Sequence, residues 1–193
     1  MLVGLNADCF TKAQTATDET LEELEALLET AGGFCTGKVL QNRHTPDSHS
    51  FIGEGKAQEV KMLVEFTQST MVVFDNELSP GNIRALEEII GVTVLDRSAL
   101  ILDIFAQRAK TKEGRLQVEL AQYQYLLPRL IGMWTHLERQ AGTSGKGPIG
   151  SKGPGETQLE TDRRHIRRKI QKLEEELEEV RKVRSTQRRR FPC

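Results

Sequence analysis

The sequence has few cysteines and no long apolar run, and each shortage excludes a class of protein. Its three cysteines, Cys9, Cys35 and Cys193, have no metal-ligand spacing, which argues against a disulfide framework and for a reducing compartment. No segment approaches the roughly 18 consecutive apolar residues of a membrane span. The N-terminus, MLVGLNADCF, lacks the basic and apolar regions of a signal peptide. We therefore expect a cytoplasmic protein without a membrane span.

The sequence also lacks the usual motifs of catalysis and nucleotide binding. Neither Gly37-Lys38 nor Gly145-Lys146 is followed by the serine or threonine of a Walker A loop. The GxGxxG match at 145–150 follows a predicted helix instead of a strand, so it is not a dinucleotide fingerprint. No nucleophile, base and orienting group stand together. We predict no catalytic residue, no metal site and no cofactor within this chain.

Charge is divided unequally along the chain, although the net charge is only -1. Residues 1–105 carry 7 Lys and Arg against 17 Asp and Glu, a net charge of -10, whereas residues 106–193 carry 20 against 11, a net charge of +9. A basic half beside an acidic half is typical of a protein that binds a polyanion through one half only. We predict that the second half contacts nucleic acid.

The first 105 residues have the pattern of a small α/β domain. Short apolar strands alternate with amphipathic helices, which predicts a parallel four-stranded sheet flanked by helices and joined by right-handed crossovers. The predicted helices are Asp18–Thr30, one opened by the stretch Phe51–Lys56 and one starting at Pro80. The decapeptide QNRHTPDSHS is predicted as an exposed loop. The expected strands are Leu2–Leu5, Phe34–Leu40, Met71–Phe74 and Val92–Leu95.

Residues 106–193 predict a different architecture, a long antiparallel two-helix coiled-coil hairpin with a glycine-rich tip. Apolar residues recur at alternating spacings of four and three on both sides of one loop. We place the helices at about 112–139 and 156–190 and the loop at 141–155, and we expect Pro128 to bend the first helix. Dimerisation through the same seams is a structural alternative. The seam residues are Leu116, Leu120, Tyr123, Leu127, Leu130, Trp134 and Leu137, then Leu159, Ile166, Ile170, Leu173, Leu177 and Val180.

The loop and the start of the second helix supply the candidate binding residues. Glycines allow a close approach of the backbone to a partner, and arginines hold phosphates bidentately. We therefore predict a tip that binds nucleic acid. Its candidate residues are Arg139, Gly145, Lys146, Gly147, Gly150, Lys152, Gly153, Gly155, Arg163, Arg164, Arg167 and Arg168.

Three further features have both a functional and a structural interpretation. His44 and His49 suggest a metal site, but no third ligand stands nearby and an exposed loop is the favoured explanation. The Gly53–Gly55 turn is at a helix start, where an anion can bind, or it is a simple backbone turn. Asp75 and Asp96 follow strands, where open α/β sheets bind ligands, or they cap helices and turns.

Five segments give the chain a family resemblance. They are FIGEGKAQEV at 51–60, FDNELSP at 74–80, the stretch at 96–122, LPRLIGMWTHLERQ at 127–140 and GPGETQLETDRR at 153–164. Together they resemble the N-terminal region of the HflX family of ribosome-associated GTPases. In that family an α/β domain and a helical hairpin precede a Ras-like GTPase domain.

The resemblance implies a function that the composition alone does not indicate. It implies that the full protein binds the large ribosomal subunit and its rRNA, hydrolyses GTP with Mg²⁺ in a C-terminal G domain, and helps split or rescue ribosomes under stress. That G domain is expected to be a partner of the present region and is absent from this chain, which ends at RRRFPC. An enzymatic alternative also stands: a stand-alone α/β domain that binds a nucleotide and hydrolyses it weakly, using Asp75, Asp96 or the Gly53–Gly55 turn.

Overall fold

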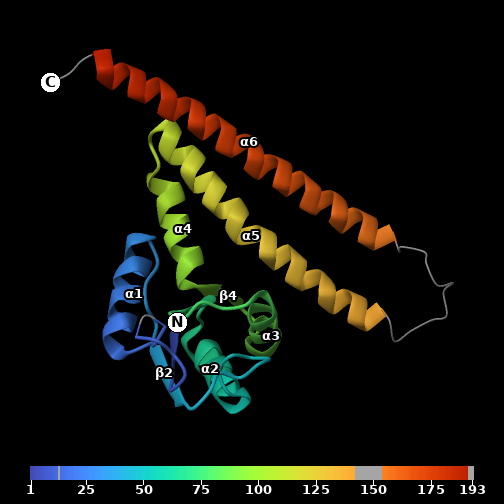
Figure 1. The fold of residues 1–193 in the computed structure, drawn as a ribbon. Helices are drawn as coiled ribbons and strands as arrows, with labels where there is room; N and C mark the ends of the chain where they lie inside the picture. The colour runs from blue at the N-terminus through green and yellow to red at the C-terminus, as the bar shows by residue number, and fades with distance from the viewer. Residues whose placement is uncertain (13, 142–153, 191–193) are drawn as a thin grey trace. The chain divides into compact units, whose positions relative to one another are not determined.

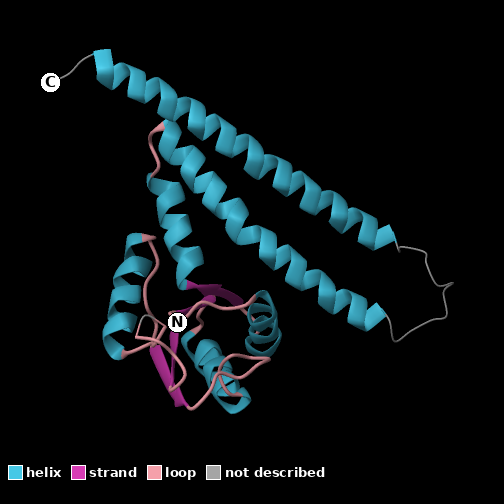
Figure 2. Ribbon diagram, viewed as in Figure 1, coloured by secondary structure: helices cyan, strands magenta, loops and turns pink. Residues whose placement is uncertain are grey.

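The structure is a computed structural model that describes residues 1–12, 14–141 and 154–190, with side chains left undescribed at 130–160 and from 187 onward. The chain divides into two compact units, Met1–Ile104 and Phe105–Cys193. The first is an α/β unit and the second is helical (Figures 1 and 2).

The α/β unit contains a fully parallel sheet of four strands in the order β2-β1-β3-β4. This confirms the predicted four-stranded parallel sheet. After β1 the chain forms β2 on one side of it, at the edge of the sheet. It then crosses to the other side of β1 to form β3 and β4. The strands are β1 (Leu2–Ala7), β2 (Lys38–Arg43), β3 (Met71–Phe74) and β4 (Thr93–Asp96).

Two pairs of helices cover the sheet, one pair on each face. Helices α1 (Asp18–Thr30) and α4 (Arg97–Arg108) pack leucines and Ile104 against Leu2 and Val73. Helices α2 (Glu54–Thr67) and α3 (Pro80–Ile90) bury their apolar stripes against the alternate strand residues, including Leu5. Side chains of successive strand residues point to opposite faces, so each strand supplies both cores.

Local signals in the sequence explain where these helices begin. Thr17 and Thr20 form a reciprocal capping box at the start of α1. Ser79 accepts a hydrogen bond from the Asn82 backbone N–H, and Pro80 occupies the first turn of α3. Both helix starts agree with the sequence prediction. Each cap depends on two residues only three positions apart, so it can be recognised from the local sequence.

The second strand is where the prediction was wrong. We expected Phe34–Leu40, but the strand is Lys38–Arg43, which includes the first three residues of the decapeptide predicted as a loop. Phe34 is 79% exposed and stands outside the sheet. β2 is an edge strand that pairs only with β1, and most of its residues are partly or fully exposed. Its side chains can therefore be polar, and the sequence lacks the apolar alternation of a buried strand.

The helical unit consists of α5 (Lys112–Ala141) and α6 (Pro154–Arg190), which lie side by side (Figure 1). Leu116 of α5 packs in one apolar cluster with Leu173 and Leu177 of α6 within a single chain. α5 continues through Pro128, and the next residue, Arg129, donates a hydrogen bond to the Tyr125 carbonyl at 3.0 Å. Most of the predicted loop, residues 142–153, lies outside the described part of the chain.

Candidate nucleic-acid interface

The basic residues at the start of α6 lie on the side of the helix that faces away from α5. Ile166 is only 8% exposed and marks the side of α6 that faces α5, together with Leu173. At 100° per residue, positions 164 and 168 lie about 160° from Ile166, and position 167 lies about 100° from it, on the adjoining flank. We call these three exposed residues the arginine stripe: Arg164, Arg167 and Arg168.

Ion pairing separates the arginine stripe from the other basic residues of α6. Lys169 pairs with Glu119 at 3.7 Å, and Arg184 with Glu113 of α5. Further along, Lys172 and Lys182 pair with glutamates four positions away.

By contrast, no member of the arginine stripe has an ion pair with the described residues. Arg163, beside the stripe, is half-buried, and its Nε atom has no hydrogen-bond partner among the described residues. Unpaired exposed guanidinium groups retain their donors for an external acceptor, and phosphate oxygens match their fork geometry.

The other predicted binding residues are located as follows. Gly145, Lys146, Gly147, Gly150, Lys152 and Gly153 lie outside the described residues. Arg139 lies in α5 and Gly155 in α6, in segments whose side chains are not described. Of the predicted set, the structure therefore describes the side chains of Arg163 and the arginine stripe. All four arginines belong to α6. The three residues of the arginine stripe are exposed, whereas Arg163 is half-buried.

A second candidate site lies in the α/β unit at the carboxyl ends of β1 and β3. A cleft of about 580 Å³ opens there, beside the point where the chain reverses its direction of winding. Such switch points are where open α/β sheets bind ligands. Phe10 and Phe51 stack on one wall, with ring centroids 6.1 Å apart. The charged lining residues are Lys12, Glu23, Asp75, Glu77 and Arg97.

Asp75, a candidate ligand-binding residue, is occupied by internal partners in this cleft. Its side chain is 5% exposed and pairs with Arg97 at 2.7 Å, while Thr20 donates to its other carboxylate oxygen. Arg97 also reaches Glu23 at 2.9 Å. Burial lowers the pKa of Arg97, but hydrogen bonds to Glu23 and Asp75 outweigh it and raise that pKa. The cleft therefore has more carboxylates than cations, and Arg97, one of its two cations, already faces two of them.

Asp96 and the Gly53–Gly55 turn have structural roles. Asp96 is fully buried and accepts a hydrogen bond from the Ala99 backbone N–H at the start of α4. The Gly53 backbone N–H donates to Gln41 Oε1 at 3.0 Å, so this donor at the start of α2 already has an internal partner. These contacts favour the structural interpretation of both features.

The histidine pair shows no metal-site geometry. His44 Nδ1 lies 2.7 Å from the Asp8 carboxylate, and both side chains are largely exposed. His49 contributes its backbone N–H to Asp47. Among the residues that the structure describes, no three histidine, cysteine, aspartate or glutamate side chains are grouped as metal ligands.

The arginine stripe was predictable in part from the sequence. The basic run at 163–169 is visible in the sequence, but its division into paired and unpaired residues depends on contacts with α5. The Thr20, Asp75 and Arg97 network was not predicted, because its members are 55 and 22 positions apart. No local spacing indicates such contacts.

Two family descriptions together match most of the chain. Residues 18–106 match the GTP-binding GTPase N-terminal region, and residues 108–190 match the GTP-binding GTPase middle region. The boundary between them falls within two residues of the division into two units.

Curated relatives give the same result. The chain is 50% identical over 163 residues to the GTPase HflX of Alkalihalophilus pseudofirmus, covering 84% of this chain and 37% of that protein. It is 50% identical over 166 residues to the GTPase HflX of Escherichia coli, covering 86% and 38%. The chain thus spans less than two fifths of the length of these two relatives.

Solved structures share the fold. The crystal structure of the complex of SsGBP with GDP aligns with a TM-score of 0.63 at 24% identity, over 96% of this chain and 45% of that one. A GTP-binding protein from Sulfolobus solfataricus, in complex with GDP, aligns with a TM-score of 0.58 at 24% identity, over 94% and 46%. In the described ranges, no helix is long and apolar enough to cross a membrane.

Proposed function

Because the chain belongs to the HflX family of GTPases, as its N-terminal and middle regions, we propose that it is the ribosome-binding and regulatory part of such a GTPase. The proposed partner is the large ribosomal subunit, contacted through rRNA by an α5–α6 coiled-coil hairpin and its glycine-rich tip. The whole protein would use this contact to split or rescue ribosomes under stress in the cytoplasm.

One observation supports this proposal above the others: the arginine stripe is exposed and has no ion pair with any described residue, whereas the other basic residues described on α6 beyond it are mostly paired. Unpaired like charges on one helix repel each other, at a few tenths of a kcal/mol per i,i+4 pair. A polyanion removes that repulsion and releases counterions on binding. The stripe is therefore a surface suited to phosphate.

The remaining part of the protein would supply the nucleotide chemistry. The relatives are GTPases more than twice as long as the matched region. We propose that their additional length holds the G domain, which binds GTP and Mg²⁺ and has the present region as its partner. No residue of the present chain is assigned to GTP hydrolysis.

Co-sedimentation with large ribosomal subunits tests the proposal. We expect the 193-residue chain to pellet with the subunits at low salt and to be released as salt rises, because counterion release drives phosphate binding. A matched control removes two cations from the α/β unit, Lys61→Ala with Arg84→Ala, and should pellet normally. Absence of the chain from the low-salt pellet would overturn the proposal.

The cleft at the carboxyl ends of β1 and β3 favours a second candidate, nucleotide binding by the α/β unit alone. Its position and stacked phenylalanines suit a base, whereas its excess of carboxylates opposes a triphosphate. Titration calorimetry of this chain with ATP and GTP separates the two. Clear heats with stoichiometric binding would support the second candidate, and we expect none.

A further inference from the structure

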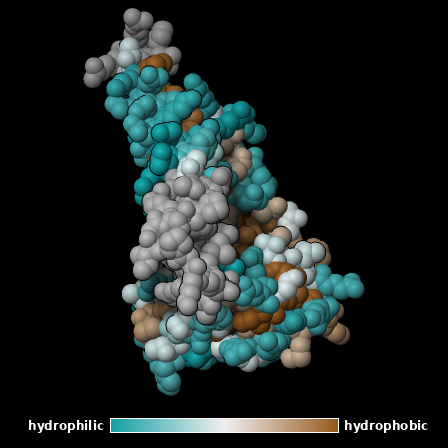
Figure 3. Space-filling view, turned by 90° about the vertical axis from the view of Figure 1, so that its right-hand side faces the viewer, coloured by the Kyte–Doolittle hydropathy of each residue, from teal (hydrophilic) through white to brown (hydrophobic). Residues whose placement is uncertain are grey.

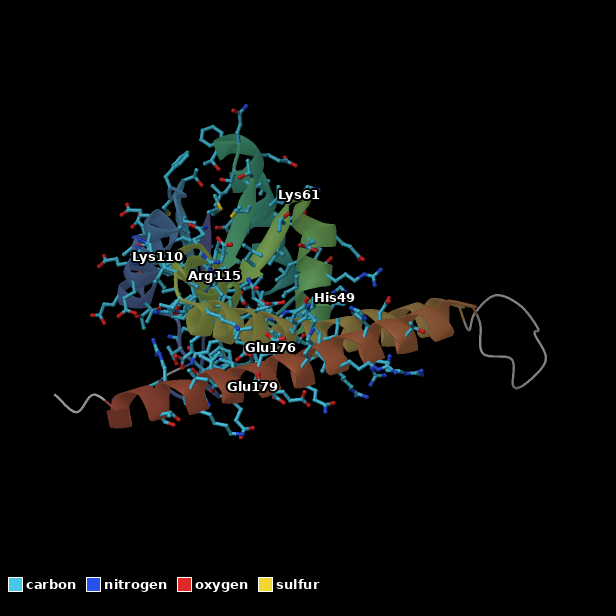
Figure 4. The ribbon with its side chains drawn as sticks, turned by 90° about the horizontal axis from the view of Figure 1, so that it is seen from above. His49, Lys61, Lys110, Arg115, Glu176 and Glu179 are labelled. Atoms are coloured by element: carbon cyan, nitrogen blue, oxygen red, sulfur yellow. The ribbon has the colours of Figure 1, made fainter. Side chains whose placement is uncertain are left out.

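The charge of α6 changes sign along the helix, which limits the surface that phosphate can occupy. After the arginine stripe come Lys169 and Lys172, both paired with glutamates, then five glutamates, and then Arg181, Lys182 and Arg184. We call the acidic segment the glutamate band. Figure 4 labels two of its members midway along α6. The band consists of Glu174, Glu175, Glu176, Glu178 and Glu179.

The glutamate band is close enough to act on a phosphate bound at the stripe. Arg168 and Glu174 are six residues apart, about 9 Å along a helix. This equals about one Debye length at physiological ionic strength, so the band repels a polyanion that extends past the stripe. Glu174 and Glu175 are exposed and have no ion pair with described residues. The unpaired basic surface therefore ends before the middle of α6, where Lys172 is paired with Glu176.

The same surface offers phosphate contacts and, among its described residues, little aromatic area for bases to stack on: the one ring beside the stripe is the imidazole of exposed His165. No phenylalanine, tyrosine or tryptophan occurs anywhere in Pro154–Arg190. On α5, Tyr123 packs beside the apolar cluster with Leu173, and the guanidinium of Arg129 lies 3.2 Å from the ring centre of Tyr125. The hydropathy view shows mainly hydrophilic side chains on the visible part of these helices (Figure 3).

Single-stranded RNA is usually bound by stacking its bases on aromatic rings, whereas a base-paired helix presents only phosphates and sugars to a basic surface. We propose that the arginine stripe binds the phosphate backbone of base-paired RNA without reading sequence, and that the glutamate band ends this contact. This inference rests on the proposed function, since it names the form of RNA that the helical unit contacts.

Binding to two RNA probes tests the form of the ligand. The 193-residue chain is titrated with a 20-base-pair RNA duplex and with one of its strands, at several salt concentrations. We expect the duplex to bind at least tenfold more tightly, and an unrelated duplex to bind equally well. Equal affinity for strand and duplex would overturn the inference, as would strong sequence preference.

Substitutions test the surface. Changing Arg164, Arg167 and Arg168 to alanine should weaken duplex binding about 30-fold or more at low salt and reduce the salt slope by about 3, one for each lost phosphate contact. The matched control, Arg181→Ala with Lys182→Ala and Arg184→Ala, removes the same charge beyond the glutamate band. We expect it to change binding less than threefold, and an equal loss in both variants would overturn the inference.

A gain-of-function variant covers the case in which alanines disturb the helix. Glu174→Gln with Glu175→Gln and Glu179→Gln should raise duplex affinity severalfold, because repulsion at the end of the stripe disappears. Unchanged affinity would contradict the role of the glutamate band as the end of the RNA contact.

Ribosome pelleting of the same proteins distinguishes the proposed ribosome-binding function from the proposed role of the arginine stripe. Duplex binding without pelleting contradicts the proposed function alone, whereas normal pelleting by the stripe variant contradicts the role of the stripe alone.

Discussion

Arg97 in the α/β unit is held by Asp75 and Glu23, whereas the arginine stripe of α6 has no acidic partner among the described residues. The same side chain therefore has two uses in one chain. In the first unit, charge is neutralised internally around a buried carboxylate. In the second, charge is left exposed, which is useful only if something outside the described chain neutralises it. The comparison predicts that changes in the first unit alter stability and changes in the second alter binding.

The largest expected effect comes from the centre of the sheet. A Cβ at Gly4 of β1 would lie 2.6 Å from the Cβ of Ala16, which is fully buried. Gly4→Ala should lower the free energy of unfolding by about 2 to 3 kcal/mol through overpacking. Urea denaturation measures the loss, and ribosome pelleting of the remaining folded protein should not change. A stable Gly4→Ala protein would show that the core near α1 is looser than described.

Removing the guanidinium of Arg97 is the direct test of internal neutralisation. Arg97→Ala leaves the Asp75 carboxylate, 5% exposed, with only Thr20 as a described side-chain partner. We expect the free energy of unfolding to fall by about 2 kcal/mol, less than for a fully buried pair because Arg97 is partly exposed. Arg84→Ala, which breaks a surface pair with Glu88, is the control and should cost under about 0.5 kcal/mol.

The loop lysines test the other half of the comparison. Lys146→Ala with Lys152→Ala should reduce the affinity for large ribosomal subunits about tenfold, at roughly 0.7 kcal/mol for each lost charge contact. The melting temperature should stay within one degree or so. If the melting temperature falls instead while binding is retained, these lysines are structural and the predicted RNA-binding tip is wrong.

The smallest effect concerns acid stability in the α/β unit. Backbone N–H groups of Ser50 and His49 donate to Asp47 and lower its pKa below 3.8. Because the folded-state pKa is depressed, this stabilisation is present above about pH 4 and is lost as the pH falls through the folded value. Asp47→Asn should therefore have lower stability at pH 6 and a flatter decline toward pH 3. Equal slopes in both proteins would show that Asp47 does not contribute.

Much of the fold followed from the sequence because its signals are local. Met71–Phe74 is a continuous apolar strand, and Asp18–Thr30 has both an apolar stripe and a cap, so their predicted bounds match the structure. β2 was misplaced because an edge strand needs no apolar alternation, and exposed Phe34 suggested a strand.

The candidate site was less accessible to prediction. The basic run on α6 is local and was found, but whether each arginine has a partner depends on residues about 50 to 70 positions away, as in the Lys169–Glu119 and Arg184–Glu113 pairs. The partners of Asp75 are equally remote. Composition indicates which side chains carry charge, and only tertiary contacts determine which of them remain available.

The central position of β1 has a consequence for how the chain folds during synthesis. β1 is translated first, yet both of its neighbours come later: β2 begins 36 residues after it, and β3 at Met71. At roughly 5 to 20 residues per second, the first strand waits several seconds for its partners. An apolar segment such as Leu2–Leu5 is a natural binding target for nascent-chain chaperones in that interval, and β1 has neighbours on both sides only when Phe74 has left the exit tunnel.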